Sequence, residues 1–166
     1  MCIRDSATNL GLDKGARAGL SSKLSEAGPD AIRKDRDKAV SRWAELRAFD
    51  QTGLSEAGAL NYAIAAFGRQ TSAETARFEY GSGPGRPSPY VVTQLSGGYF
   101  SMPDFMDNQH RIEDAAGADA FLSRLDAFAG VLDGETAKIR EDAGLGVIPP
   151  DFICLLYTSD AADDMQ

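Results

Sequence analysis

The fold of this chain is decided by residues 114–150, which read DAAGADAFLSRLDAFAGVLDGETAKIREDAGLGVIPP. Apolar residues recur in this stretch at the three- and four-residue spacing of one helix face. The spacing predicts a long helix that begins after Asp114 and is either continuous or broken near Gly130. The glycines and prolines from Gly144 to Pro150 are typical of a helix end. The residues expected to form its apolar face are Ala118, Phe121, Leu122, Leu125, Phe128, Leu132, Ile139 and Ala143.

Two well-marked helices precede the long one. Gly28-Pro29-Asp30 begins a helix that runs to about Phe49, because proline suits the first turn and an acid there complements the helix dipole. Ser55 is a suitable N-cap for the next helix, which runs to about Phe78. Each helix has apolar residues at helical spacing, which predicts a buried stripe on each. The stripes consist of Ile32, Ala39, Val40, Trp43, Leu46 and Phe49, and of Leu60, Ile64, Phe67 and Thr71.

The remaining segments predict weaker structure. Residues 13–27 favour a marginal helix, and residues 103–109 a short one. The run GSGPGRPSP at 81–89 is an exposed loop, because glycine and proline together prevent regular structure. Residues 90–95 have the β-branched and aromatic bias of an extended segment. The predicted fold is therefore mainly α, an irregular assembly of about five or six helices with a Gly/Pro-rich loop, and an incomplete domain.

The codons that could encode the two ends of the chain indicate that the ends differ in origin from the rest. Back-translated with ordinary codons, residues 154–159 can read TGTCTCTTATACACATCT, whose reverse complement encodes residues 1–5 and the first base of Ser6. This DNA resembles the recognition end used in transposase-based library preparation. Segments of such origin are excluded before fold reasoning. We expect residues 1–6 and 154–166 to be adapter-derived, and residues 7–153 to be a piece of a longer reading frame.

Charge and cysteine content exclude several classes of function. The chain has 17 basic and 25 acidic residues, of which one and four lie in the end segments, leaving a net charge of about −5. Basic residues do not cluster, so we expect no nucleic-acid partner. No apolar run approaches the roughly 18 residues of a membrane span. Both cysteines, Cys2 and Cys154, lie in the end segments, so no disulfide is expected.

The residues that could carry chemistry are few. His110 is the only histidine, too few for a zinc site or a cysteine–histidine pair, and a histidine bonded to the backbone is the favoured interpretation. Gly81 to Gly85 resembles a phosphate-binding loop only superficially, because no lysine-serine or lysine-threonine pair follows. Acid pairs such as Glu141 with Asp142 are interpreted as surface helix acids. We therefore predict no catalytic residue and no metal ligand in this chain.

Aromatic residues gather in the second half of the chain. They line either a groove, with Gln94 as a polar group among them, or the core, and packing is the favoured alternative for most. The residues concerned are Tyr90, Tyr99, Phe100, Phe105 and Phe152.

Four stretches carry a resemblance to a known family. They read YVVTQL at 90–95, MPDFMDNQHRI at 102–112, AFLSRL at 120–125 and GVIPP at 146–150. In this order they resemble the N-terminal part of the bacterial family known as domain of unknown function 885. The resemblance covers most of residues 7–153.

The resemblance implies a mostly helical protein of the zinc-peptidase-like (gluzincin) group. Members carry a histidine-glutamate-x-x-histidine helix in their C-terminal half, so zinc is expected only in the longer parent protein, with no cofactor in this chain. The N-terminal helices form a wall of the substrate cleft, which makes Tyr90 and Gln94 the expected substrate-binding residues. Residues 7–153 would then be the N-terminal helical part of a larger peptidase-like domain. Its partners would be the missing C-terminal half and a peptide substrate, in the periplasm or cell envelope.

Two functional hypotheses follow. In the first, the chain is the non-catalytic, substrate-cleft part of a zinc-dependent peptidase-like hydrolase. In the alternative, it is a self-contained helical bundle that binds a partner through aromatic residues near Tyr99, Phe100 and Phe105. Source DNA that continues past Ile153 into a histidine-glutamate helix would favour the first hypothesis, and a stop soon after Pro150 the second.

Overall fold

The computed structural model describes residues 7–85 and 87–151, and its elements are helical. In chain order they are the 3₁₀ helix η1 (Gly15–Leu20) and the α-helices α2 (Pro29–Arg47), α3 (Glu56–Thr75), α4 (Gly98–Asn108) and α5 (Ala115–Gly144). No strand occurs in the described part, where an isolated bridge joins Thr93 to Ser96. The predicted mainly α class is confirmed.

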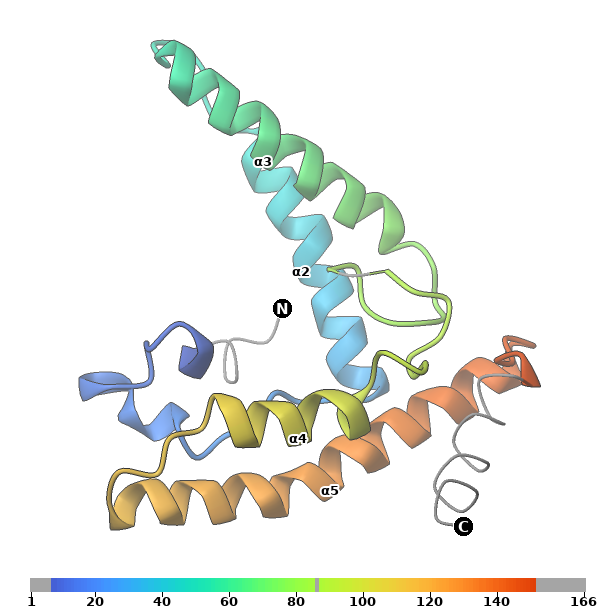
Figure 1. The fold of residues 1–166 in the computed structure, drawn as a ribbon. Coiled ribbons are helices and arrows are strands. Elements are labelled where there is room, and N and C mark those ends of the chain that lie inside the picture. The colour runs from blue at the N-terminus through green and yellow to red at the C-terminus, as the bar shows by residue number, and fades with distance from the viewer. Residues whose placement is uncertain (1–6, 86, 152–166) are drawn as a thin grey trace, which may run out of the picture.

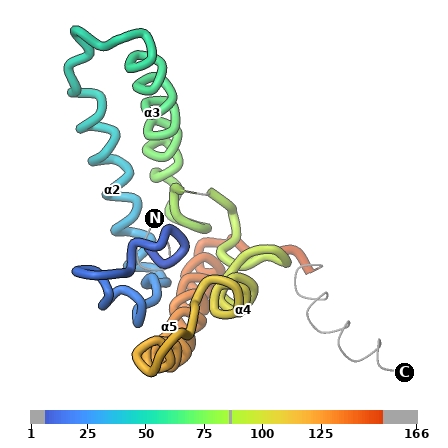
Figure 2. The backbone as a smooth tube through the Cα atoms, turned by 60° about the vertical axis from the view of Figure 1, so that its left-hand side comes forward, coloured from blue at the N-terminus to red at the C-terminus, as the bar shows by residue number. Residues whose placement is uncertain are grey.

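The helices form two pairs that meet at one end (Figure 1). α2 and α3 are an antiparallel hairpin, and α4 packs along α5. The hairpin projects away from the α4–α5 pair, and α2 meets α5 near its own N-terminus, as the turned view in Figure 2 also shows. Among the described helices, α3 packs only against α2.

Two glycines allow α2 and α5 to approach closely. Gly28, which precedes α2, has a φ of 104°, a conformation that side chains disfavour. A Cβ atom on Gly134 of α5 would lie 2.6 Å from the carbonyl oxygen of Ala27. Only glycine therefore fits at either side of this crossing.

Helix α5 is continuous through Gly130, so the alternative of a break there is wrong. Asp114 caps the helix, since its Oδ1 accepts from the Gly117 N–H at 2.7 Å. One interior glycine costs only about 1 kcal/mol relative to alanine. Packing of the flanking turns against α4 outweighs that cost.

The marginal helix predicted for 13–27 is wrong beyond its centre. The chain forms only the 3₁₀ helix η1 and then runs without regular structure to Gly28. Tertiary contacts explain the difference, because the carbonyls of Leu20 and Lys23 accept from Arg124 of α5 and Leu24 inserts into the core.

Other boundaries differ by a few residues. α4 begins at Gly98, before the predicted 103, and holds Pro103 in its interior. α2 and α3 end at Arg47 and Thr75, earlier than predicted. Residues 90–95 pair with no strand in the described chain.

The core is small and lies between the N-terminal segment, α4 and α5. The apolar stripe predicted on α2 is partly covered: Ala39 is buried and Ile32, Trp43 and Leu46 are half-buried, whereas Val40 and Phe49 are 53% exposed. The stripe predicted on α3 is exposed, because α2, its only partner among the described helices, packs on the other side. The core consists of Leu24, Met102, Phe105, Met106 and Val131, with Ala27, Phe121 and Phe128 packed against it.

Candidate functional site

The buried face of α5 carries charge. Arg124, Glu135, Lys138 and Asp142 share the face of Ala120 and Val131, following one another at three- to seven-residue spacing. The predicted face overlaps this one only in part, since Phe121 and Phe128 pack against the core whereas Leu122 and Leu125 are 59% and 52% exposed. The candidate site is therefore built from charged residues that the apolar pattern did not reveal.

Arg124 joins three segments of the chain. Its side chain is fully buried, and its Nη1 lies 2.7 Å from Nδ1 of His110, at the end of α4. Its Nη2 donates to Thr8 Oγ1 at 2.6 Å and to the Leu20 carbonyl at 3.2 Å, and its Nε to the Lys23 carbonyl at 3.1 Å. The guanidinium also lies 4.9 Å from the ring centre of Phe105.

His110 uses both ring nitrogens in this cluster. Nε2 lies 3.0 Å from the carbonyl of Gly117 and must donate, because a carbonyl only accepts. Nδ1 then accepts from Arg124, which fixes the neutral tautomer. The backbone-bonded state predicted for His110 is the one found. In the described residues, no three histidine, cysteine or acidic side chains are placed to hold a metal ion.

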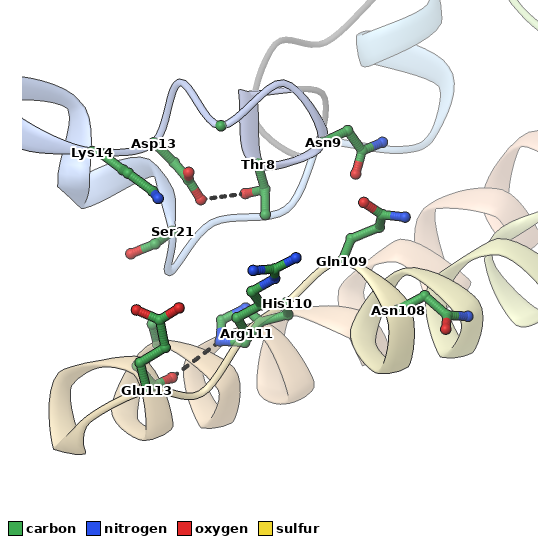
Figure 3. Close-up of a pocket in the computed structure, with 13 residues that line it drawn as sticks. Thr8, Asn9, Asp13, Lys14, Ser21, Asn108, Gln109, His110, Arg111 and Glu113 are labelled. Carbon is green, nitrogen blue, oxygen red and sulfur yellow. Dashed lines mark hydrogen bonds between the residues drawn. The ribbon is translucent and has the colours of Figure 1, made fainter.

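A polar pocket of about 360 Å³ opens beside this cluster. Figure 3 shows Asp13 and Lys14 of the N-terminal segment on one side, and Arg111 and Glu113 of the α4–α5 connection on the other. Thr8 donates to Asp13 at 2.7 Å. Because the lining mixes both signs of charge, the pocket can hydrogen-bond a polar molecule without selecting its charge.

A second buried cluster anchors the Gly/Pro-rich loop to α5. Lys138, which is 1% exposed, donates to the carbonyl of Glu79 and to the carboxylates of Glu141 and Asp142 at 2.8, 2.9 and 2.8 Å. Asp142 in turn accepts from the Gly81 N–H at 3.0 Å. The hydrogen bond from Lys138, together with Arg33, lowers the pKa of Glu141. Asp142 is buried, so the prediction of a surface acid at this position is wrong. The N–H of Gly81, at the start of the Gly/Pro-rich loop, donates to the Asp142 carboxylate.

Glu135, the fourth charged residue on this face of α5, is half-buried. Its carboxylate accepts from the Gly98 N–H at 2.8 and 3.0 Å, and so caps the N-terminus of α4. Burial raises its pKa, although the hydrogen bond from Gly98 opposes that effect. Glu135 also lines a pocket of about 280 Å³ with Glu26, Ile32 and other residues at the α2–α5 crossing.

The two predicted substrate residues lie in different surroundings. Tyr90 is half-buried and borders a space of only about 10 Å³ near Val147, which is room for one water at most. Gln94 is not among the residues around that space. It lies in a turn where its carbonyl accepts from the Tyr99 hydroxyl at 2.8 Å. Burial raises the pKa of that hydroxyl.

The aromatic residues divide between core and surface. Phe105 belongs to the core, as the packing alternative predicted, whereas Phe100 is 50% exposed. Tyr99 lies edge-on to Phe100 with ring centres 6.3 Å apart. Phe152 lies outside the described residues.

Comparison with known proteins assigns the chain to a family. The model of a bacterial family of proteins of unknown function, DUF885, matches residues 5–164. The chain belongs to the DUF885 family. Two of the stretches that carried the resemblance meet in the structure, since His110 and Arg124 are hydrogen-bonded. In this DUF885 chain those motif residues therefore hold the fold together.

A solved structure shares the fold. It is described as the "putative lipoprotein from Colwellia psychrerythraea", and it superposes with a TM-score of 0.79 at 21% sequence identity. The match covers 96% of this DUF885 chain and 29% of the other, so the chain spans less than a third of its structural relative. Among curated proteins, none matches. No described helix is long and apolar enough to cross a membrane.

Proposed function

We propose that this chain is the non-catalytic, N-terminal helical part of a longer zinc-dependent peptidase-like hydrolase. The observation that carries the proposal is the size relation: a fold matching 96% of this chain makes up 29% of its structural relative. Membership of DUF885 and the zinc-peptidase-like group that the family resemblance implies supply the chemistry. The ends of the chain, 1–6 and 154–166, are proposed to be adapter-derived.

The division of labour follows from the residues present. The described part of the chain offers no metal-binding group, so zinc and the general base would both belong to the remainder of the protein. Zinc lowers the pKa of a bound water towards 7 and polarises a carbonyl. The helices described above would supply a cleft wall, with Tyr90 and Gln94 contacting a peptide. An envelope location fits the description of the structural relative as a lipoprotein.

The test is zinc-dependent hydrolysis by the complete protein. We expect it to bind about one zinc ion per chain and to cleave unstructured peptides, with activity lost to a chelator and restored by zinc. Changing the glutamate of the histidine-glutamate helix to glutamine should abolish cleavage and keep the metal. A complete protein that binds no zinc and cleaves no peptide would rule the proposal out.

The residue assignments need their own variants. Tyr90→Ala and Gln94→Ala in the complete protein should raise KM by about tenfold and leave kcat nearly unchanged, as expected for groups that bind substrate without reacting. Leu95→Ala is the matched control, because Leu95 is exposed in the same segment. If all three variants keep the same KM, these two residues do not bind substrate.

The second candidate, a binding module, is favoured only by Phe100. This residue presents an exposed ring on α4, whereas Phe105 of the same helix is buried in the core. A reading frame that ends shortly after Pro150 would favour this candidate, as would a folded, monomeric chain that loses its partner on Phe100→Ala.

A further inference from the structure

The outer face of α3 is an apolar surface on which no other described residue packs closely. Leu60, Ile64 and Phe67 are 63%, 63% and 75% exposed. Their spacing of four and three residues places them on one side of the helix. Tyr62, on the other side, stacks on Phe49 and donates to the Leu46 carbonyl of α2 at 3.3 Å. The apolar side therefore faces directly away from the hairpin partner.

The composition of α3 is that of a buried helix. Residues 57–68 contain no charged side chain, yet none of the helix is buried. Ala63, Ala65 and Ala66 lie beside the large apolar residues, and a Cβ on Gly68, which follows Phe67, would meet nothing within 4 Å. Small residues let a second helix approach closely. Helices with this composition are normally covered on more than one side.

We infer that the face formed by Leu60, Ile64 and Phe67 packs against an apolar helix face in the C-terminal part of the longer protein. The inference rests on the proposed function, since it requires that longer protein. The inference goes further by naming the surface at which the two parts of that protein meet. Figures 1 and 2 show the α2–α3 hairpin projecting away from α4 and α5, and among the described helices α3 packs only on α2. The exposure of the three side chains shows that the described chain does not cover this face.

The size of the structural relative decides the occupant. A match over 96% of this chain makes up 29% of the other, so the relative is about 3.3 times as long and has a large body of additional chain that could pack on α3. A membrane surface fits less well. Helices that lie on membranes carry lysine and arginine along their polar side, whereas α3 has one basic residue, Arg69.

Thiol labelling tests the docking directly. Ile64→Cys is introduced into the complete protein and into the 166-residue chain, with Cys2 and Cys154 of the latter replaced by serine. Arg42→Cys, on the exposed charged side of α2, is the matched control. We expect a maleimide to label the I64C thiol at least about tenfold more slowly in the complete protein than in the short chain. The R42C thiol should react at the same rate in both.

The outcomes distinguish failure of the docking surface on α3 from failure of the proposed function. Equal I64C rates in the two proteins overturn the docking surface, and zinc-dependent hydrolysis by the same preparation would then leave the proposed function standing. Protection of I64C without hydrolysis keeps the docking surface and removes the enzyme. Protection in the short chain that disappears on dilution assigns the face to a second copy and overturns the inference.

Discussion

Arg124 shows why a charged residue can belong in the core of a helical protein. Its guanidinium satisfies two backbone carbonyls, a hydroxyl and the acceptor nitrogen of His110 within one buried cluster. Removing it would leave those acceptors buried without donors. Each such loss costs about 1–3 kcal/mol.

Arg124→Met should therefore lower the free energy of unfolding by about 3 kcal/mol or more. Arg140→Met is the control, because Arg140 lies exposed on the same helix and its loss should stay within about 0.5 kcal/mol. Urea unfolding followed by circular dichroism at low protein concentration measures both. Equal losses would mean that the Arg124 cluster contributes no stability.

Glu135 should give the fold a measurable pH dependence. Its raised pKa means that the folded chain binds the proton more tightly than the unfolded chain, whose pKa is near the ordinary value of 4.5. Stability contributed by this group is thus complete below that value and falls as pH rises through the raised pKa. Glu135→Gln should remove that fall. Parallel stability profiles of the two proteins from about pH 4 to 7 would contradict the assignment.

At the scale of elements, the sequence predicts where the long helices lie but not which of their faces is buried. Helical spacing and the caps at Pro29, Ser55 and Asp114 locate α2, α3 and α5 to within a few residues. Phe121 and Phe128 of the face predicted on α5 do pack against the core. The rest of the buried side escaped prediction because it alternates charged with apolar residues. Hydrophobic periodicity cannot detect such a face. Pairing of Arg124 with His110 depends on tertiary placement, so the motif stretches were visible in sequence while their contact was not.

Two glycines of α5 should respond oppositely to alanine. Gly134→Ala places a methyl group against the Ala27 carbonyl at 2.6 Å and should destabilise the fold by about 1–3 kcal/mol. Gly130→Ala meets nothing within 4 Å and should stabilise it by about 0.5–1 kcal/mol, because alanine favours the helix. Unfolding midpoints in urea distinguish the two. A shift in the same direction for both would refute the close α2–α5 crossing.

Helix α3 packs on only one side among the described helices, which should affect the exchange of its amides. Backbone amides of α3 in the 166-residue chain should exchange with deuterium at least about tenfold faster than those of α5 near Arg124, because helices with little tertiary cover are marginal. Mass spectrometry of peptides from the two helices provides the comparison. Equal protection would show that the hairpin is stable by itself.

At the scale of the whole molecule, the exposed apolar faces of α3 and α5 mean that, among the described residues, more large apolar side chains are exposed than buried. We expect the chain to bind a dye such as ANS and to self-associate as its concentration rises. Ile64→Lys should reduce both effects, whereas Arg42→Lys should change neither. A monomeric chain that binds no dye and melts cooperatively would contradict an incomplete domain.

The central claim is that these helices are part of a longer metallopeptidase-like protein, and sequencing the source DNA across Ile153 tests it most directly. The account predicts that the reading frame leaves the present sequence at about this residue and continues into a helix with histidine-glutamate-x-x-histidine. Genomic DNA that encodes Cys154 onward and then stops would contradict both the adapter origin of the ends and the enzyme assignment.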